Sequence, residues 1–342
     1  MSARDSRKRA LDAWARGCLQ RCGVMLSEDF TLETASDDAS FRRYFRYEGD
    51  PSYIFVDAPP EQEDSRKFVS IDQMIRDVGL NSPEIFEHDF DNGFLMMEDL
   101  GSTLYLDRLN VGDGSEIERM YSDAFDALAG MQQIKAELPL YDKAKLLEEM
   151  NLFPDWFLYR QLQIEDFAEA GLEGVFELML QNTAEQPQVF VHRDYHCRNL
   201  MVTTHGNPGI IDFQDAVLGP LTYDLVSLLK DCYHQFSQSQ ISKWVGQCRL
   251  RLQADGRLDS GVSESEFFRW FELMGFQRHL KCAGIFSRLN IRDSKPGYLA
   301  DIPLVIGYMM ELGERYQELA PFCGWLEEVI VPRLSSSEFT RG

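Results

Sequence analysis

Basic residues are scarce in this 342-residue sequence. Its 34 Lys and Arg residues face 56 Asp and Glu residues, which gives a formal net charge of −22 at pH 7. A protein with so negative a field repels polyanions, so we expect neither nucleic acid nor an anionic membrane surface among its partners. An anionic ligand then requires a local cluster of cations.

Long apolar runs and paired cysteines are also missing. Pro303–Met310 is among the longest apolar stretches and is far shorter than the about 18 residues of a membrane-spanning helix. The first ten residues are polar and lack the apolar core of a secretory signal. The seven cysteines are odd in number and form no C-x-x-C pair, which favours reduced thiols over a disulfide framework. We therefore expect a cytoplasmic protein.

The remaining composition is that of a folded protein. Hydrophobic residues make up 44% of the sequence and aromatic residues 12%, which excludes an intrinsically disordered chain. A chain of 342 residues is long enough to bury a full core and to form two lobes.

The first hundred residues predict a sheet with an inserted helix. Residues 5–22 and 64–77 show apolar side chains at helical spacing, as at Phe68, Ile71 and Ile75. Runs typical of strands occupy residues 30–34, 41–47, 53–56, 85–87 and 93–97. Together these runs predict a five-stranded antiparallel sheet.

After Glu98-Asp99-Leu100-Gly101 the pattern becomes helical. Helix-like stretches rich in apolar side chains cover residues 119–134, 145–181 and 263–289. Strands followed by helices indicate an α+β protein with two segregated units and a hinge near residue 100. We expect a small lobe over residues 1–100 that binds nucleotide. A larger, mainly helical lobe over residues 101–342 would carry the catalytic loop and bind the acceptor.

Two polar segments follow short apolar runs in the middle of the chain. The first, HRDYHCRN at 192–199, lies between the apolar runs 189–191 and 200–202. Because apolar runs flank it on both sides, we predict that it forms the turn of a β-hairpin-like element. The second segment, DFQD at 212–215, follows the apolar pair at 210–211.

These segments supply the oxygen-bearing side chains that phosphoryl transfer needs. A carboxylate must orient the acceptor hydroxyl and take its proton, and oxygen ligands must hold Mg²⁺ on the nucleotide phosphates. The spacing H-x-D-x4-N assigns Asp194 as the base and Asn199 as a metal ligand. Asp212 supplies a second carboxylate to the metal. The predicted cofactors are ATP and Mg²⁺.

The same two segments, followed by G-P-x-x-Y-D-L at 219–225, resemble the aminoglycoside phosphotransferase/choline kinase-like superfamily. The resemblance spans most of the chain and implies a protein-kinase-like bilobal fold. It implies the same roles as above, with Asp194 as the base and with Asn199 and Asp212 as metal ligands. It implies that Asp224 braces the catalytic loop and that His192 stabilises the same loop. An N-cap of the apolar helix that follows stays open as a second role for Asp224.

On the nucleotide side the resemblance implies a hinge and a loop over the phosphates. Glu98 to Leu100 match the hinge, whose backbone pairs with the adenine edge. The loop 35–40, which contains Ser36 and Ser40, matches the phosphate-covering loop, although it carries no G-x-G-x-x-G.

The phosphate-binding lysine that such folds carry on the third strand is missing. The strand over residues 53–56 continues into Asp57 instead. Arg43, Arg46 or Lys67 can substitute, and an arginine would clamp phosphate with two parallel hydrogen bonds.

Longer stretches of the sequence resemble one group within the superfamily. The strings at 192–202, at 210–233 and at 295–305 (KPGYLADIPLV) are similar to those of the anomeric amino-sugar kinases of cell-wall recycling. The resemblance implies that the C1 hydroxyl of N-acetylmuramate and N-acetylglucosamine is phosphorylated. A sugar-1-phosphate nucleotidyltransferase would then convert the product to a UDP-sugar.

A basic island interrupts the acidic sequence at Arg278, His279 and Arg288. These residues are candidates to meet an anionic acceptor, such as one with a lactyl carboxylate, or the nucleotide phosphates. A helix face that is solvated or paired with nearby acids explains the same spacing.

Three other functions stay open at this point. The spacing His192-x-Asp194-x-His196 also suits a metallohydrolase, although the other histidines form no second cluster. The net charge suits a cationic acceptor such as an aminoglycoside or choline. The missing lysine is compatible with a nucleotide-binding pseudokinase that acts as a scaffold.

Overall fold

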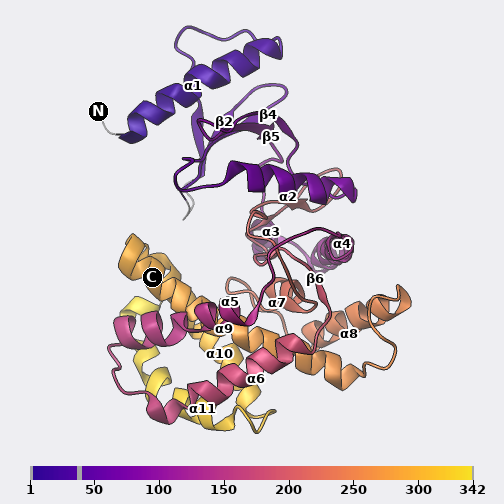
Figure 1. Cartoon of the computed structure of the whole chain (residues 1–342), viewed down its shortest axis with the longest axis vertical. Coiled ribbons are helices and arrows are strands. Elements are labelled where there is room, and N and C mark those ends of the chain that lie inside the picture. The colour runs from indigo at the N-terminus through magenta and orange to yellow at the C-terminus, as the bar shows by residue number, and fades with distance from the viewer. Residues whose placement is uncertain (1–2, 37–40, 341–342) are drawn as a thin grey trace. The chain divides into compact units, whose positions relative to one another are not determined.

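The computed structural model describes residues 3–36 and 41–340, so that Ser40 lies outside the described part of the chain. The chain forms two compact units (Figure 1). The first comprises Met1–Tyr105 and Asn199–Gln214, and the second comprises Leu106–Arg198 and Asp215–Gly342. This division differs from a single boundary at residue 100, because the 16 residues Asn199–Gln214 belong to the first unit.

The first unit contains the predicted five-stranded antiparallel sheet, in the order β1-β2-β3-β5-β4. Its strands are β1 (Glu33–Ser36), β2 (Arg43–Tyr47), β3 (Tyr53–Asp57), β4 (Ile85–Asp89) and β5 (Phe94–Glu98). The prediction placed the first strand at residues 30–34, which is wrong. Pairing begins at Glu33, opposite Arg46, while Leu32 is buried in the core. The apolar side chains of Phe30 and Leu32 thus pack in the core, and their backbone does not pair with β2.

Two helices cover this sheet, and Figure 1 shows them on opposite sides of it. Helix α1 (Ala3–Arg21) packs an apolar stripe that includes Leu11, Ala15 and Cys18 against strand side chains such as Phe55. Helix α2 (Ser65–Asp77) buries Phe68, Ile71 and Ile75 at helical spacing. The Asp64 carboxylate caps α2 by accepting the N–H groups of Arg66 and Lys67 at 3.0 and 3.2 Å.

The hairpin predicted around the catalytic loop is not formed. Strand β6 (Gln188–Val191) pairs with β9 (Val217–Pro220), and β7 (Leu200–Met201) pairs with β8 (Gly209–Ile210). The loop 192–199 therefore joins two different sheets. Four apolar runs of two to four residues offer several antiparallel pairings, and the alternation of side chains does not select among them.

The β7–β8 hairpin is anchored within the first unit. Val202 N–H donates to the Thr103 carbonyl at 2.8 Å, and Ile210 N–H donates to the Asn81 carbonyl at 2.7 Å. Gly209 leaves room for Leu100, whose Cδ1 would lie 2.9 Å from an added Cβ. Asn199 and Asp212 are thereby held on the unit that carries the sheet.

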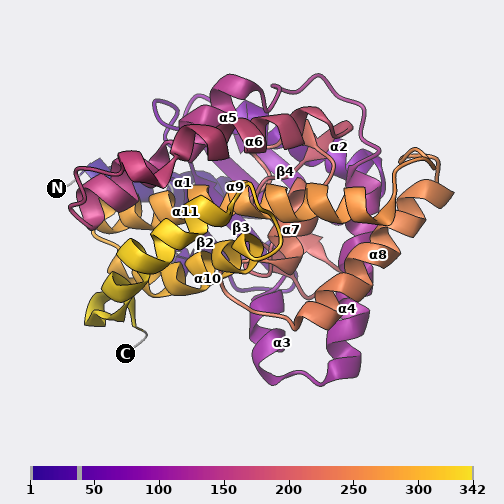
Figure 2. The same cartoon turned by 90° about the horizontal axis from the view of Figure 1, so that it is seen from below.

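The second unit is helical and is built around α9 (Glu264–Asp293) (Figure 2). Helices α6 (Leu172–Ala184), α7 (Tyr223–Leu229) and α10 (Ile302–Gly313) pack against it. The other helices of this unit are α4 (Gly114–Met131), α5 (Lys143–Met150), α8 (Gln238–Ala254) and α11 (Ala320–Trp325), and α3 (Tyr105–Val111) begins at its boundary. No helix in residues 3–36 or 41–340 is long and apolar enough to cross a membrane.

The helix-like stretch predicted over residues 145–181 consists of separate helical segments. Helix α5 ends at Met150, η1 covers Phe153–Gln161, η2 covers Ala168–Ala170, and α6 begins at Leu172. Gly171 precedes α6 with φ of +64°, a conformation that favours glycine.

Gly284 on α9 marks the closest approach between α9 and the segment that follows α5. An added Cβ would lie 2.3 and 2.4 Å from the backbone carbon and oxygen of Leu152. We predict that Gly284→Ala lowers the free energy of unfolding by about 1–3 kcal/mol, because backbone atoms must move. Urea denaturation measures this change.

Gly307→Ala on α10 is the matched control, because no atom lies within 4 Å of its added Cβ. It should raise stability by up to about 1 kcal/mol through helix propensity. Equal effects of the two substitutions would contradict the close approach at Gly284.

Candidate active site

The loop 192–199 is held by the buried carboxylate of Asp224 on α7. Its Oδ2 accepts His192 N–H at 2.7 Å and its Oδ1 accepts Arg193 N–H at 2.9 Å. His192 Nδ1 in turn accepts Asp194 N–H at 3.3 Å, and the Asp194 carbonyl accepts His196 N–H at 3.0 Å. The helix cap is Thr222, so the Asp224 side chain serves the loop and not the helix N-terminus.

Arg193 adopts a backbone conformation that is unusual for a residue with a side chain. Its φ is +80°, in the left-handed region that costs a non-glycine residue about 1–2 kcal/mol. Its side chain forms an ion pair with Glu149 and donates to the Asp215 carbonyl at 3.4 Å. Its carbonyl accepts the Ser227 hydroxyl at 3.3 Å. These contacts hold the residue before Asp194 in one conformation.

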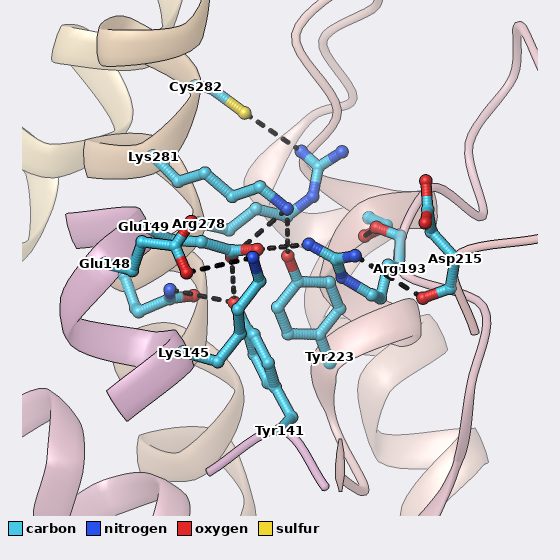
Figure 3. Close-up of polar contacts among 12 residues, drawn as sticks. Tyr141, Lys145, Glu148, Glu149, Arg193, Asp215, Tyr223, Arg278, Lys281 and Cys282 are labelled. Atoms are coloured by element: carbon cyan, nitrogen blue, oxygen red, sulfur yellow. Dashed lines mark hydrogen bonds and ion pairs between the residues drawn. The ribbon is translucent and has the colours of Figure 1, made fainter. Parts of the chain in front are cut away.

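Glu149 on α5 is the centre of a buried polar network (Figure 3). Besides Arg193, it binds the Tyr141 hydroxyl, and Lys281 Nζ of α9 lies 3.3 Å from its Oε2. Lys281 also donates to the Tyr223 hydroxyl at 3.1 Å. Burial alone would raise the pKa of Glu149, but Lys281 and Arg193 outweigh it and keep that pKa below its ordinary value.

Asp194 lies in the positive field of this cluster. Burial works to raise the pKa of its carboxyl, but Lys281, Arg278 and Arg193 outweigh that effect and hold the pKa far below its usual range. Burial lowers the pKa of His196 to about 3, so its ring is neutral at pH 7 and adds no charge. Asp194 is therefore an ionised acceptor of hydrogen bonds at neutral pH.

Asn199 and Asp212 are brought together in the first unit. Asn199 Nδ2 donates to Asp212 Oδ2 at 3.2 Å, and the Asn199 carbonyl accepts Ile211 N–H at 3.1 Å. Gln214 Nε2 donates to Asp212 Oδ1 at 2.8 Å. Asp212, like Arg193, has a positive φ of +63°. The strands on either side thus present one carboxamide oxygen and one carboxylate side by side.

These two side chains fit a magnesium ion. Both offer hard oxygen atoms: Asp212 has its carboxylate, and Asn199, whose amide nitrogen donates to Asp212, has its Oδ1. Within the described ranges, no three His, Cys, Asp or Glu side chains gather to hold an ion. Mg²⁺ at this place would complete its shell with phosphate and water, and among the described residues the spacing His192-x-Asp194-x-His196 produces no such three-ligand cluster.

The arginines that were candidates for the missing lysine each have a carboxylate partner. Arg43 Nε lies 3.0 Å from Oδ2 of the buried Asp57, the residue that stands after the third-strand run. Arg7 of α1 binds the other oxygen of Asp57 at 2.9 Å, which sequence reasoning missed. Arg46 binds Asp99 at 2.7 Å.

At the predicted hinge, Glu98 N–H donates to the Glu84 carbonyl at 2.8 Å, and Leu100 lies against Gly209. Ser36 ends β1 opposite Tyr44. Lys67 belongs to the first turn of α2.

The residues of the basic island have separate surroundings. Arg278 is buried, and its Nη1 lies 3.9 Å from the Cys232 sulfur and 3.7 Å from the Cys282 sulfur. His279 stacks on Tyr308, and its Nε2 lies 3.0 Å from the Lys230 carbonyl. Arg288 is half-buried, and its Nε is one of the buried atoms without a hydrogen-bond partner in the described structure.

The network leads to a prediction for Glu149. In Glu149→Gln, Arg193 and Lys281 stay buried without their anion, so we expect the free energy of unfolding to fall by about 3–5 kcal/mol at pH 7. Because the folded pKa of Glu149 lies below its ordinary value of 4.5, its contribution is present above that pH and is lost as the pH falls. Urea titrations at pH 7 and pH 4 should therefore show a larger deficit at pH 7.

Glu148→Gln is the control, because Glu148 is exposed and pairs with Lys145 at 3.1 Å on the same helix. We expect a change of at most about 0.5 kcal/mol at either pH. Equal destabilisation by both substitutions would mean that Glu149 is no more than a surface charge.

The sequence matches one protein family and several curated proteins. Residues 31–247 match the model of the phosphotransferase enzyme family. A curated N-acetylmuramate/N-acetylglucosamine kinase from Pseudomonas putida is 43% identical over 295 residues, which cover 85% of this chain and 86% of that protein. A protein of the same name from Pseudomonas aeruginosa is 40% identical over 327 residues, covering 92% and 95%.

Solved structures share the fold at low identity. An ADP-bound aminoglycoside phosphotransferase superposes with a TM-score of 0.57 at 15% identity, covering 86% of this chain and 97% of that one. Choline kinase LicA from Streptococcus pneumoniae gives 0.58 at 12% identity, covering 86% and 98%. The protein-kinase-like α+β fold predicted from the sequence is thus confirmed. The chain belongs to the phosphotransferase enzyme family and is itself a phosphotransferase.

Proposed function

We propose that this phosphotransferase is an ATP- and magnesium-dependent kinase of amino sugars, which phosphorylates the anomeric C1 hydroxyl of N-acetylmuramate and N-acetylglucosamine. The observation that carries the proposal is the similarity, at 40% identity over 92% of the chain, to a curated kinase named for these two sugars. The ionised Asp194 and the pairing of Asn199 with Asp212 supply the chemistry that such a reaction needs.

Asp194 acts on the acceptor. Its carboxylate accepts a hydrogen bond from the C1 hydroxyl and aligns the oxygen with the γ-phosphorus. The new O–P bond forms as the bond from the γ-phosphorus to the β–γ bridging oxygen breaks, ADP leaves, and the hydroxyl proton passes to the carboxylate. The low pKa of Asp194 suits a loose transition state in which the proton moves late, because orientation then matters more than basicity.

Asn199 and Asp212 would hold the metal. When bound, Mg²⁺ neutralises the phosphate charge that develops during transfer. Gln214 and Asn199 donate to the two oxygens of Asp212 and so fix the plane of its carboxylate. On the nucleotide side we assign Arg43 to the phosphates, the Glu98–Leu100 backbone to adenine, and the loop with Ser36 and Ser40 to the phosphate cover.

Arg278 and Arg288 remain proposals for the acceptor side. Arg278 would act through its charge on Asp194, since its guanidinium is buried next to two thiols. His279 would support the same helix face through its contact with Tyr308. The product, a sugar 1-phosphate, is the substrate class of a nucleotidyltransferase that makes UDP-sugars. We place both reactions in the cytoplasm, where ATP and UTP are available.

A substrate panel tests the proposed function. ADP release would be measured with Mg·ATP and each of N-acetylmuramate, N-acetylglucosamine, kanamycin and choline, with EDTA as the metal-free arm. We expect turnover with the two amino sugars and none in EDTA. Turnover with kanamycin or choline, and with neither amino sugar, would mean that the proposed acceptor is wrong. Nucleotide binding without turnover on any acceptor would favour a pseudokinase.

The assignment of the base is tested by Asp194→Asn. We expect kcat to fall by at least about 10²-fold, because the amide neither takes the proton nor attracts the hydroxyl as strongly. Binding of Mg·ADP, measured by calorimetry, should persist and shows that the variant is folded. Asp155→Asn, at an exposed carboxylate of η1, is the control and should retain kcat. Full turnover in Asp194→Asn would remove Asp194 from the mechanism.

A further inference from the structure

Arg198 is an exposed arginine at the end of the catalytic loop, four residues after Asp194. In the part of the chain that the structure describes, no ion pair joins it to a carboxylate. Asp301 contributes to the electrostatic field around it. Two other cations of the same unit, Arg193 and Lys281, are bound to the buried acid Glu149. The positive charge of Arg198 is thus available to a ligand.

Two tyrosines position its guanidinium. The central carbon of the guanidinium lies 4.4 Å from the centre of the Tyr233 ring and 5.8 Å from the centre of the Tyr298 ring. Tyr233 also shares a side-chain hydrogen bond with Arg198, so these contacts orient the guanidinium and leave its other N–H groups for a ligand. Those N–H groups form the fork that matches a carboxylate with two parallel hydrogen bonds.

The tyrosines tie this arginine to the neighbourhood of the proposed base. The Tyr233 ring lies 5.3 Å from the His196 ring, and His196 N–H donates to the Asp194 carbonyl. The polar network of Glu149 and the ring of Tyr233 therefore contact the same loop, on the residues before and after Asp194.

Tyr298 belongs to the string KPGYLADIPLV, which none of the roles above explains. It lies in η3 (Pro296–Asp301), and its ring stacks on Phe286 of α9 at 5.6 Å with an angle of 24° between the ring planes. This stack fixes the Tyr298 ring on the long central helix. The string thereby presents an aromatic ring to the catalytic loop.

We propose that Arg198, held by Tyr233 and Tyr298, binds the carboxylate of an acidic amino-sugar acceptor and so sets the preference for an acidic over a neutral sugar. The inference rests on the proposed function and deepens it, because it assigns the group that distinguishes N-acetylmuramate from N-acetylglucosamine. Those two sugars differ by a lactyl ether whose carboxylate is charged at pH 7. An arginine held by aromatic rings loses little side-chain freedom when it binds, which favours affinity.

The test compares kcat/KM for the two sugars in Arg198→Gln and in the unsubstituted protein. A charge-assisted hydrogen bond to a carboxylate supports about a 10- to 100-fold effect. We therefore expect the ratio of kcat/KM for N-acetylmuramate to that for N-acetylglucosamine to fall by about that factor. An unchanged ratio overturns the proposal. An equal fall for both sugars also overturns it, because Arg198 would then act on the phosphoryl group or on the loop.

A change in the ligand gives a second readout that needs no variant. The methyl ester of N-acetylmuramate keeps the lactyl ether but carries no charge. We expect the unsubstituted protein to lose about the same factor with the ester, and Arg198→Gln to respond equally to acid and ester. Loss with the ester in both proteins would place the carboxylate contact elsewhere.

Arg160→Gln is the matched control. Arg160 is exposed, and its guanidinium lies 4.4 Å from the centre of the Trp156 ring on η1, where no described contact joins it to the catalytic loop. Its substitution should leave the ratio unchanged, and a shift equal to that of Arg198→Gln would overturn the assignment. If the unsubstituted protein phosphorylates neither sugar, the proposed function itself fails, which separates that outcome from a failure of Arg198.

Discussion

Glu149 on α5 is the anion on which the positive charges beside the catalytic loop depend. A buried cation without a partner is costly, and both Arg193 and Lys281 find theirs in this carboxylate. The ion pair also holds Arg193 at a positive φ, which the backbone alone would avoid. Asp194 follows directly in the chain, so its position, and two of the cations that lower its pKa, depend on a residue 45 positions earlier.

The two halves of the candidate chemistry are supported by different units. Asp194 lies on the loop of the helical unit, whereas Asn199 and Asp212 lie on a hairpin of the unit that contains the sheet. The chain crosses between the units at Arg198–Asn199 and again at Gln214–Asp215, inside the two motifs themselves. Two requirements therefore fix the spacing of residues in these motifs. The motifs must supply the side-chain oxygen atoms, and the chain must pass between the two units within them.

The sequence indicated what is local and missed what joins distant segments. Short strand-like runs predicted the five strands, and the spacing of Phe68, Ile71 and Ile75 predicted α2 to within a residue. The pairing of β6 with β9 was missed, because short apolar runs are interchangeable until tertiary contacts choose among them. Glu149 was missed for a related reason, since a glutamate in a short amphipathic helix ordinarily faces solvent.

The central motif shows the same limit at the level of single residues. The spacing H-x-D-x4-N pointed to Asp194 and Asn199 because their relation is local. It gave no reason to single out Arg198, whose role depends on two rings that lie 35 and 100 positions later in the chain. The one available signal was the string around Tyr298, because it resembles the corresponding string of the amino-sugar kinases.

An acidic protein that handles anionic ligands must confine its positive charge to chosen places. The net charge of −22 disfavours anions in general, so each cation near the proposed site needs either a fixed acid or a ligand. Arg193 and Lys281 have a fixed acid in Glu149 and are not free to bind a ligand. Arg198 is held instead by aromatic rings, which orient a charge without neutralising it. A carboxylate on the acceptor then supplies the missing anion, and a neutral sugar leaves that arginine to water. Arg198, held by aromatic rings and not by an acid, therefore discriminates between the two sugars by charge. The sugar ring itself can bind in the same way in both cases.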